Sequence, residues 1–390
     1  MNSLTYAEQA LLDLLPSRHD SKGSAPNGKM PDEFDARTTP GQCQLIAGNR
    51  TGVLPAALLS HDPSTPLIVH AFDFHHARAI SDFLAESGFD PAQIVQCTSS
   101  VTSPSAPYSS AFFQTTPRSM PTELVLDQLE DIHRSLADNS FLYAAFEGDA
   151  DDALRTVKKV FPSVNVLRRD KKVVVFRCRR TAPLAKYRSF SSQWSASVPG
   201  GQPLQFTSLP GCFCHRRADP GGLALAEVAS KFVETDPSIA SAPSPLRILD
   251  MGCGCGLVGL LVADALRRRT STPPHLTLID SHARAIAASR INAAQFNLAD
   301  STRFILSDSG LPRGEVATHD IFVGNPPYYS EYRIAEIFLS TAYRALRPGG
   351  TCLTVVKTAT GLKALQEKYF RTAEVIPRRG YAVLRSTKAS

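Results

Sequence analysis

The feature that most constrains this chain is an alternation of strand and helix patterns that sharpens at Leu246. The stretch LRILDMGCGCGLVGLLVADAL reads as a buried strand, a glycine loop and a helix. Further apolar strands follow at 276–280, 302–308, 320–324 and 351–357, with helical segments between them. Such alternation is typical of an α/β fold, in which helices cover a mostly parallel sheet.

The first half of the chain shows a similar alternation but lacks a glycine loop. Short buried strands are expected at 44–49, 66–72, 93–97 and 141–148. A chain of 390 residues exceeds what one compact core usually needs, and a glycine- and proline-rich break lies at 197–203. We therefore expect two α/β domains, residues 1–196 and 197–390.

The glycine loop predicts a cofactor site. Gly252, Gly254 and Gly256 follow the strand that ends at Asp250. Glycines permit a tight turn and a close approach of a ligand to the backbone. A carboxylate before the first glycine suits an ammonium group and repels a pyrophosphate, which favours S-adenosylmethionine over a dinucleotide.

Two further acids end the next strands. Asp280 is placed to accept hydrogen bonds from both ribose hydroxyls, and Asp308 to accept one from the adenine amino group. Each acid alone also fits a helix N-cap after a strand. Three acids at successive strand ends beside a glycine loop favour the cofactor site.

The fourth strand ends in Asn325, Pro326, Pro327 and Tyr328. An asparagine oxygen and a proline carbonyl can each accept one N–H of a planar amino group, holding its nitrogen in line with a methyl donor. The prolines fix φ and donate no N–H, and the tyrosine offers a face for stacking a flipped base. A turn that merely closes a strand would explain the prolines alone.

These motifs resemble a known family. ILDMGCGCG, LTLID and NPPY, in this order, look like class I S-adenosylmethionine-dependent methyltransferases that act on exocyclic or amide nitrogen. FTSLPGCFCHRRADPGGLALAE and RRGYAVLRSTK are similar to bacterial small-subunit ribosomal RNA guanine-N2 methyltransferases. That resemblance implies two Rossmann-like methyltransferase-fold domains. The N-terminal one is degenerate and recognises RNA, and the C-terminal one is catalytic, with a seven-stranded mostly parallel sheet. The implied substrate is one guanine of ribosomal RNA or of a ribosomal subunit.

A departure from the family pattern at Tyr328 keeps alternatives open. The family usually has phenylalanine where this chain has Tyr328, and NPPY is also typical of enzymes that methylate glutamine amides or adenine. A protein glutamine N5-methyltransferase is one alternative. A non-catalytic RNA-binding assembly protein is the other.

Basic residues gather in three places, within a net charge of +6. The longest run lies between Arg168 and Arg188, and the others are Arg267–Arg269 and Arg378–Arg379. Such clusters attract a polyanion, although a single one is usually a solvated face.

The eight cysteines do not resemble a disulfide framework. Cys212, Cys214 and His215 invite a metal interpretation, but their spacing is not that of a zinc site, so we expect buried thiols and no metal. The chain has no apolar run of membrane-span length and no secretory signal. These features predict a cytoplasmic protein.

Overall fold

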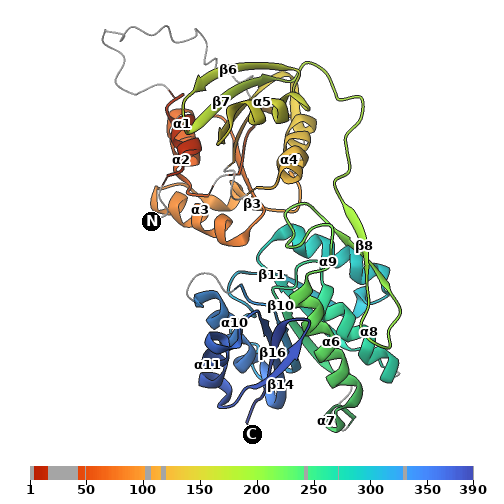
Figure 1. The fold of residues 1–390 in the computed structure, drawn as a ribbon. Helices are drawn as coiled ribbons and strands as arrows, with labels where there is room; N and C mark the ends of the chain where they lie inside the picture. The colour runs from red at the N-terminus through yellow and green to blue at the C-terminus, as the bar shows by residue number, and fades with distance from the viewer. Residues whose placement is uncertain are drawn as a thin grey trace, which may run out of the picture. The chain divides into compact units, whose positions relative to one another are not determined.

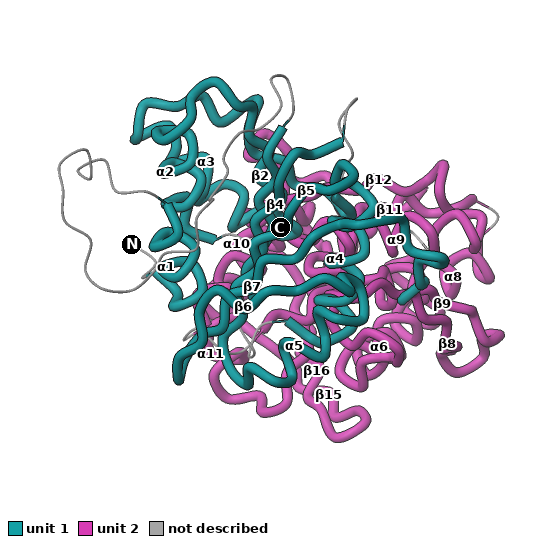
Figure 2. The backbone as a smooth tube through the Cα atoms, turned by 90° about the horizontal axis from the view of Figure 1, so that it is seen from above, with its two compact units in different colours: residues 1–190 teal, residues 191–390 magenta. Residues whose placement is uncertain are grey.

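The structure is a computed structural model. It describes residues 4–15, 43–48, 50–101, 107–115, 120–240, 245–270, 272–327 and 332–389. The chain divides into two compact units, residues 1–190 and 191–390 (Figure 2). The division leaves β8 (Ser192–Ala196) in the second unit, where it pairs with β9 (Leu204–Ser208), whereas the expected boundary would place β8 in the first.

The second unit is built on a seven-stranded sheet in the order β12-β11-β10-β13-β14-β16-β15 (Figure 1). Only β16 runs antiparallel to its neighbours. The strands are β10 (Arg247–Met251), β11 (His275–Asp280), β12 (Thr302–Leu306), β13 (His319–Gly324), β14 (Leu346–Val356), β15 (Glu374–Arg378) and β16 (Tyr381–Thr387). The helices are α6 (Pro220–Thr235), α7 (Pro237–Ala240), α8 (Leu257–Arg269), α9 (Ala283–Gln295), α10 (Arg333–Ala345) and α11 (Ala359–Phe370), with a 3-10 turn, η2 (Ala299–Ser301).

The first unit repeats this arrangement, with the order β3-β2-β1-β4-β5-β7-β6 and an antiparallel β7. Its strands are β1 (Gln44–Ala47), β2 (Leu67–Ala71), β3 (Val95–Cys97), β4 (Tyr108–Thr115), β5 (Leu136–Glu147), β6 (Ser163–Arg169) and β7 (Val173–Arg179). Its helices are α1 (Tyr6–Leu12), α2 (Val53–His61), α3 (Phe74–Glu86), α4 (Thr122–Ser135) and α5 (Ala150–Lys158), with a 3-10 turn, η1 (Pro91–Gln93). The predicted fold is confirmed: the chain forms two methyltransferase-fold α/β units, and the second has the expected seven-stranded mostly parallel sheet. The first unit, for which no strand number was predicted, has a seven-stranded sheet as well.

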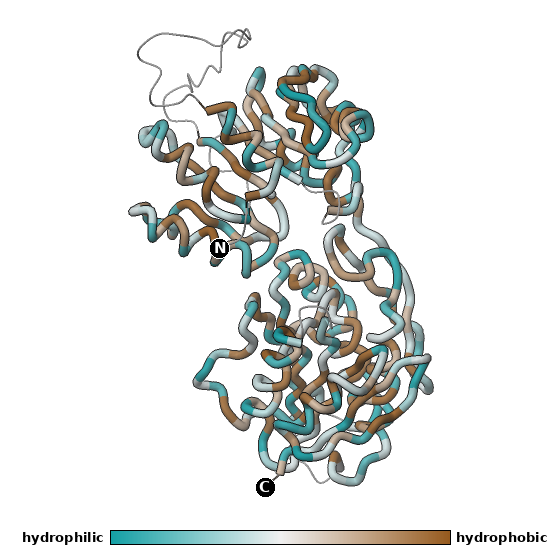
Figure 3. Tube along the Cα trace, turned by 60° about the vertical axis from the view of Figure 1, so that its left-hand side comes forward, coloured by the Kyte–Doolittle hydropathy of each residue, from teal (hydrophilic) through white to brown (hydrophobic). Residues whose placement is uncertain are grey.

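Each sheet is buried on both faces. In β10, Ile248 belongs to the hydrophobic cluster that includes α6, α8 and α9, whereas Leu249 belongs to the one that includes α10 and α11. Leu45 and Ile46 of β1 divide in the same way between two clusters of the first unit. Neighbouring residues of a strand point to opposite faces, so a strand covered on both sides reads as a continuous apolar run. Hydrophobic and hydrophilic stretches accordingly alternate along both units in Figure 3.

Among the described residues, no helix has the length and apolarity needed to cross a membrane.

Candidate active site

The parallel register brings the predicted site residues to one edge of the second sheet. Met251 of β10 pairs with Ile279 of β11 on one side and with Gly324 of β13 on the other. The residues that come next on these three strands are Gly252, Asp280 and Asn325. Ligands of open α/β sheets bind at this carboxyl edge.

All three glycines of the loop adopt a backbone conformation that other residues rarely reach. Their φ angles are 68° at Gly252, 55° at Gly254 and 86° at Gly256. A Cβ on Gly252 would lie 2.8 Å from Cζ of Phe338, so this glycine is also needed for packing. A Cβ on Gly254 would meet no atom within 4 Å, so the middle glycine borders open space. The loop thus exposes its backbone to a ligand at Gly254.

Asp250 lies beneath the loop, with 2% of its surface exposed. Its Oδ2 accepts a hydrogen bond from the backbone N–H of Gly259 in the first turn of α8, at 2.8 Å. Burial raises the pKa of this carboxyl to about 7, the nearby charge of Asp280 adds to the rise, and the Gly259 bond opposes it. Asp250 therefore ties the strand to α8, and its predicted bond to an ammonium group stays a prediction.

Asp280 is half-buried and holds the loop from the neighbouring strand. Its Oδ2 accepts from the backbone N–H of Gly254 at 2.9 Å, and its Oδ1 accepts from that of His282 at 2.8 Å. Each oxygen of a carboxylate can accept more than one hydrogen bond, and the predicted bonds of Asp280 to ribose hydroxyls stay a prediction. Asp308, also half-buried, lies just beyond the end of β12, at the same edge. Its contact with adenine stays a prediction.

These residues fit S-adenosylmethionine. Gly254 borders open space at the carboxyl edge, and Asp280 contacts the same glycine, so a ribose can be held beside an exposed backbone. The buried Asp250 adds a carboxyl group under the loop. The loop itself, residues 252–256, carries no basic side chain. A cationic cofactor therefore suits the site better than a phosphorylated one.

Asn325 continues directly from β13 and is half-buried. Its Nδ2 donates to Oδ2 of Asp219 at 2.8 Å, a contact between residues 106 positions apart. Pro326 is buried and Pro327 half-buried, so the backbone after Asn325 is held in place. Tyr328 lies outside the described residues.

Asp219 is a residue of the site that the sequence motifs did not reveal. It is the N-cap of α6, and its Oδ2 also accepts from the backbone N–H of Gly222 at 2.6 Å. The signal in the sequence was Asp219 before Pro220, which reads as an ordinary helix start. Nothing local indicated that the same carboxylate reaches the catalytic loop.

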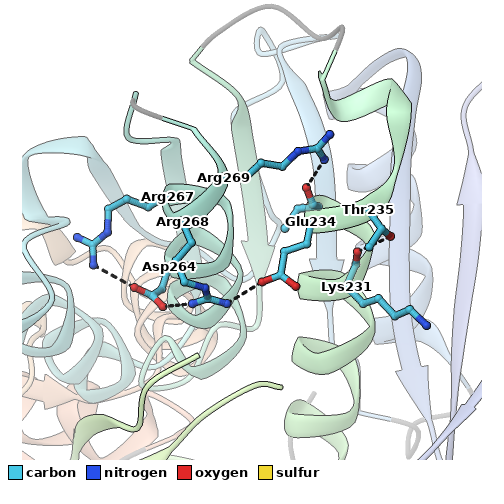
Figure 4. Close-up of polar contacts among 8 residues, drawn as sticks. Lys231, Glu234, Thr235, Asp264, Arg267, Arg268 and Arg269 are labelled. Carbon is cyan, nitrogen blue, oxygen red and sulfur yellow. Dashed lines mark hydrogen bonds and ion pairs between the residues drawn. The ribbon is translucent and has the colours of Figure 1, made fainter. Parts of the chain in front are cut away.

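The basic cluster Arg267–Arg269 has partners within the chain (Figure 4). Arg267 and Arg268 both pair with Asp264 on α8, and Arg268 also reaches Glu234 on α6 at 2.7 Å. Arg269 donates to the backbone oxygen of Val233 at 2.7 Å. These arginines join the ends of α6 and α8.

Arg378 and Arg379 pair with the buried carboxylate of Glu227 on α6. These two ion pairs connect α6 to the turn between β15 and β16. They help to hold α6, the helix that carries Asp219, in its place within the unit.

Most of the long basic run is also engaged. Arg180 is 9% exposed, donates to the backbone oxygen of His133 at 2.9 Å and pairs with Asp138. The other cations of this run with ion pairs or hydrogen bonds are Arg168, Arg169, Lys172, Arg179 and Arg188. Most cations of these clusters are therefore engaged within the chain, and the polyanion surface stays a prediction. Lys171 and Lys186 remain exposed cations of this run.

The cysteines are free thiols. Burial raises the pKa of Cys212 to about 11 and that of Cys255 to about 12, so both are protonated at neutral pH. Nδ1 of His215 lies 3.0 Å from the hydroxyl of Ser208. Within the described ranges, no group of three or more His, Cys, Asp or Glu side chains is arranged to hold a metal ion.

A seven-stranded sheet of this order, with a glycine loop after β10 and an acid at the end of β11, defines the class I methyltransferase fold. Residues 203–385 match the family model of the methyltransferase small domain. The predicted class, an S-adenosylmethionine-dependent methyltransferase, and its cofactor are thereby confirmed at the level of the domain family.

Similar proteins include enzymes of both ribosomal subunits. A ribosomal RNA small subunit methyltransferase C from Pseudomonas entomophila (strain L48) is 29% identical over 53% of this chain and 58% of its own length. A ribosomal RNA large subunit methyltransferase G from Streptomyces avermitilis is 25% identical over 88% of this chain and 87% of its own length. The matches to three small-subunit relatives span between 46% and 58% of those proteins.

The fold of both units has a solved counterpart. The structure of the T. thermophilus 16S rRNA N2 methyltransferase, in complex with AdoMet and guanosine, has a TM-score of 0.69 at 19% identity. It covers 90% of this chain and 89% of that one.

Proposed function

We propose that this chain transfers a methyl group from S-adenosylmethionine to the exocyclic N2 amino group of a guanine in ribosomal RNA. The observation that carries the proposal is the place of Asn325 and the two prolines, at the sheet edge next to the glycine loop. The ribosomal RNA relatives and the second methyltransferase-fold unit support an RNA substrate. On this reading the enzyme works in the cytoplasm.

The chain's residues hold the target nitrogen. Asn325 Oδ1 and the carbonyl of Pro326 each accept one N–H of the guanine amino group, which turns the nitrogen lone pair toward the methyl group. When bound, the cofactor would supply that methyl group from a sulfonium, which leaves as a neutral thioether. A new N–C bond forms as the S–C bond breaks, its electron pair stays on sulfur, and a proton leaves the nitrogen for water. The two oxygens stabilise the positive charge that develops on the nitrogen.

Asp280 binds the ribose hydroxyls of the cofactor, Gly254 lets it approach the backbone, and Asp250 supports the loop from below. Gly252 and Gly256 give the loop its shape. Asp308 completes the site at the adenine end. Tyr328 is assigned, from the sequence, to stacking against the base.

The first unit favours ribosomal RNA over a glutamine side chain. It is a complete α/β unit with a seven-stranded sheet, which a small protein substrate does not require. We assign it to RNA recognition, with Lys171 and Lys186 as exposed cations for phosphate contacts.

Nucleoside mass spectrometry tests the proposal. Small and large ribosomal subunits, and their naked RNAs, from cells lacking the gene are incubated with the enzyme and isotope-labelled S-adenosylmethionine. We expect label in N2-methylguanosine from one of the four substrates, and the labelled fragment identifies the subunit. Label only in methyladenosine or methylglutamine would contradict the proposal, and no label at all would favour a non-catalytic binding protein.

A further inference from the structure

The side chain of Asn325 is held by a charged partner. The Nδ2 group donates to Asp219 Oδ2 at 2.8 Å. A carboxylate can only accept, so it must face the NH2 end of the amide and not the oxygen. This contact therefore fixes which end of Asn325 faces the substrate.

Asp219 is itself fixed by its neighbours. Its Oδ2 accepts from the backbone N–H of Gly222 at 2.6 Å, and the thiol of Cys214 lies 3.7 Å from its Oδ1. A Cβ added to Gly221 would lie 3.2 Å from the same Oδ2, and a Cβ added to Gly222 would lie 3.3 Å from it. The pair of glycines thus leaves room for the carboxylate against the start of the helix.

The helix behind Asp219 is anchored in turn. Glu227 of α6 is 5% exposed and accepts ion pairs from Arg378 and Arg379. Arg268 and Arg269 of α8 hold the C-terminal end of α6 through Glu234 and the backbone oxygen of Val233. Asn325 is thus oriented by a residue on a helix that is held at its middle and at its C-terminal end.

We infer that Asp219 is a positioning residue of the methyl-transfer reaction, which orients the Asn325 amide so that its oxygen faces the target amino group. This inference rests on the proposed function. The negative charge on the NH2 side also polarises the amide and makes its oxygen a better acceptor for the charge that develops on the target nitrogen. Asp219 itself does not touch the substrate.

The contact with Asp219 also determines the expected activity of the Asn325→Asp variant. That substitution sets a second carboxylate against Asp219 at hydrogen-bond distance, and two like charges repel each other there. The single variant is therefore expected to be nearly inactive. Adding Asp219→Asn restores the hydrogen bond in the reverse direction, because the amide introduced at position 219 can donate to the carboxylate introduced at position 325.

Single-turnover methylation and cofactor titration on the full chain test the inference. Asp219→Ala is expected to lower the methyl-transfer rate about 10- to 100-fold, because the amide loses its fixed orientation, and to leave cofactor affinity within about twofold. Asp219→Asn keeps an acceptor and a helix cap, so its rate is expected to stay within about fivefold of wild type.

The matched control is Asp149→Ala. Asp149 caps α5 in the first unit through the same kind of bond, accepting from the N–H of Asp152 at 2.7 Å. Both alanine variants should lower Tm by similar amounts, but only Asp219→Ala should lose rate. Equal rates of the two alanine variants, or a joint loss of rate and cofactor affinity in Asp219→Ala, would overturn the inference.

The double variant keeps the inference testable if Asp219→Ala does not fold. Asn325→Asp with Asp219→Asn should be at least tenfold faster than Asn325→Asp alone, and a rate no faster would overturn it. A wild-type enzyme that forms no N2-methylguanosine would instead refute the proposed function. Wild-type activity that falls in Asn325→Ala but persists fully in Asp219→Ala would refute this inference alone.

Discussion

The two units have sheets of the same topology but carry different residues at equivalent positions. The register between β13 and β14 shifts between His319 and Ile321. The register between β4 and β5 shifts at the corresponding place, between Tyr108 and Ser110. Counting onward from this shift, Asn325 corresponds to Gln114. By the same registers, Asp250 is equivalent to Ile46 of the first unit, and Asp280 is equivalent to Ala71.

The outer glycines are kept while the middle one is replaced. Gly48 and Gly52 occupy the places of Gly252 and Gly256 and also have positive φ, at 79° and 80°. Arg50 stands where the second unit has Gly254. The outer glycines therefore serve the turn and the start of the helix, and the middle glycine is the one that we propose to lie against the ligand.

A carboxylate also supports the loop in the first unit, but it comes from elsewhere. Glu8 of α1 is fully buried and accepts from the backbone N–H of Leu54, in the first turn of α2, at 3.3 Å. Asp250 does the same for α8 in the second unit. The first unit thus keeps the architecture of a cofactor site and lacks its ligand-binding residues.

The largest expected effect concerns Asp250, whose counterpart Ile46 cannot ionise. Below about pH 4 the carboxyl is protonated in the folded and the unfolded chain. Between about pH 4 and the folded pKa of about 7, only the unfolded chain releases the proton, so the free energy of unfolding falls as pH rises. The loss approaches 4 kcal/mol at most, as an order of magnitude. Urea unfolding of Asp250→Asn should show a weaker pH dependence over this range, whereas an unchanged slope would refute the buried-carboxyl account.

The next effect concerns the catalytic loop. Asn325→Gln gives the second unit the residue of the first and moves the amide by about one methylene. We expect the methyl-transfer rate to fall by about 10²–10³, because the acceptor no longer meets the target nitrogen, with little change in cofactor affinity. Single-turnover kinetics with saturating cofactor measures the rate. Asn325→Gln at the wild-type rate would mean that Asn325 is not the acceptor.

The third prediction concerns Asp280→Ala, which gives the second unit the residue that the first unit has at the equivalent position, Ala71. It removes a charged acceptor for the ribose hydroxyls, typically about 1.5–3 kcal/mol per bond, so affinity should fall roughly 10- to 100-fold. Isothermal titration calorimetry gives the affinity, and near-ultraviolet circular dichroism checks that the loop keeps its fold. An unchanged affinity would remove Asp280 from the site.

The smallest expected effect concerns RNA binding by the first unit. Lys171→Glu and Lys186→Glu remove exposed cations, and each phosphate that is no longer neutralised should lower the salt slope of RNA affinity by about one unit. Filter binding at several salt concentrations measures that slope. Lys231→Glu, an exposed lysine of the second unit on α6, is the matched control. Equal slopes for all variants would show that this face does not touch RNA.

The sequence predicts the cofactor edge well because its signals are local. A glycine loop, a strand-ending acid and Asn325-Pro326-Pro327 each sit next to the strand that positions them, and parallel pairing brings them together. The contact between Asp219 and Asn325 could not be predicted in this way, because it joins residues 106 positions apart. Distance along the chain also explains why the ion pairs of the basic clusters could not be predicted: Glu227 lies 151 positions from Arg378.

The relationship of the two units is equally hidden in the sequence. Strand order and register show the equivalence, yet the residues that would mark it, such as Asp250 and Ile46, differ in chemical type. A core tolerates many apolar sequences, whereas a site tolerates few. A unit can therefore keep this fold without the motifs of the cofactor site.

The stoichiometry of cofactor binding tests the central claim most directly. Calorimetric titration of the full chain with S-adenosylmethionine should give one molecule per chain. The variant Gly254→Arg, which copies Arg50, should bind none, because the side chain fills the open space beside the loop and adds a cation near a cationic ligand. Two molecules per chain, or one molecule still bound by Gly254→Arg, would contradict the assignment of the cofactor to this loop.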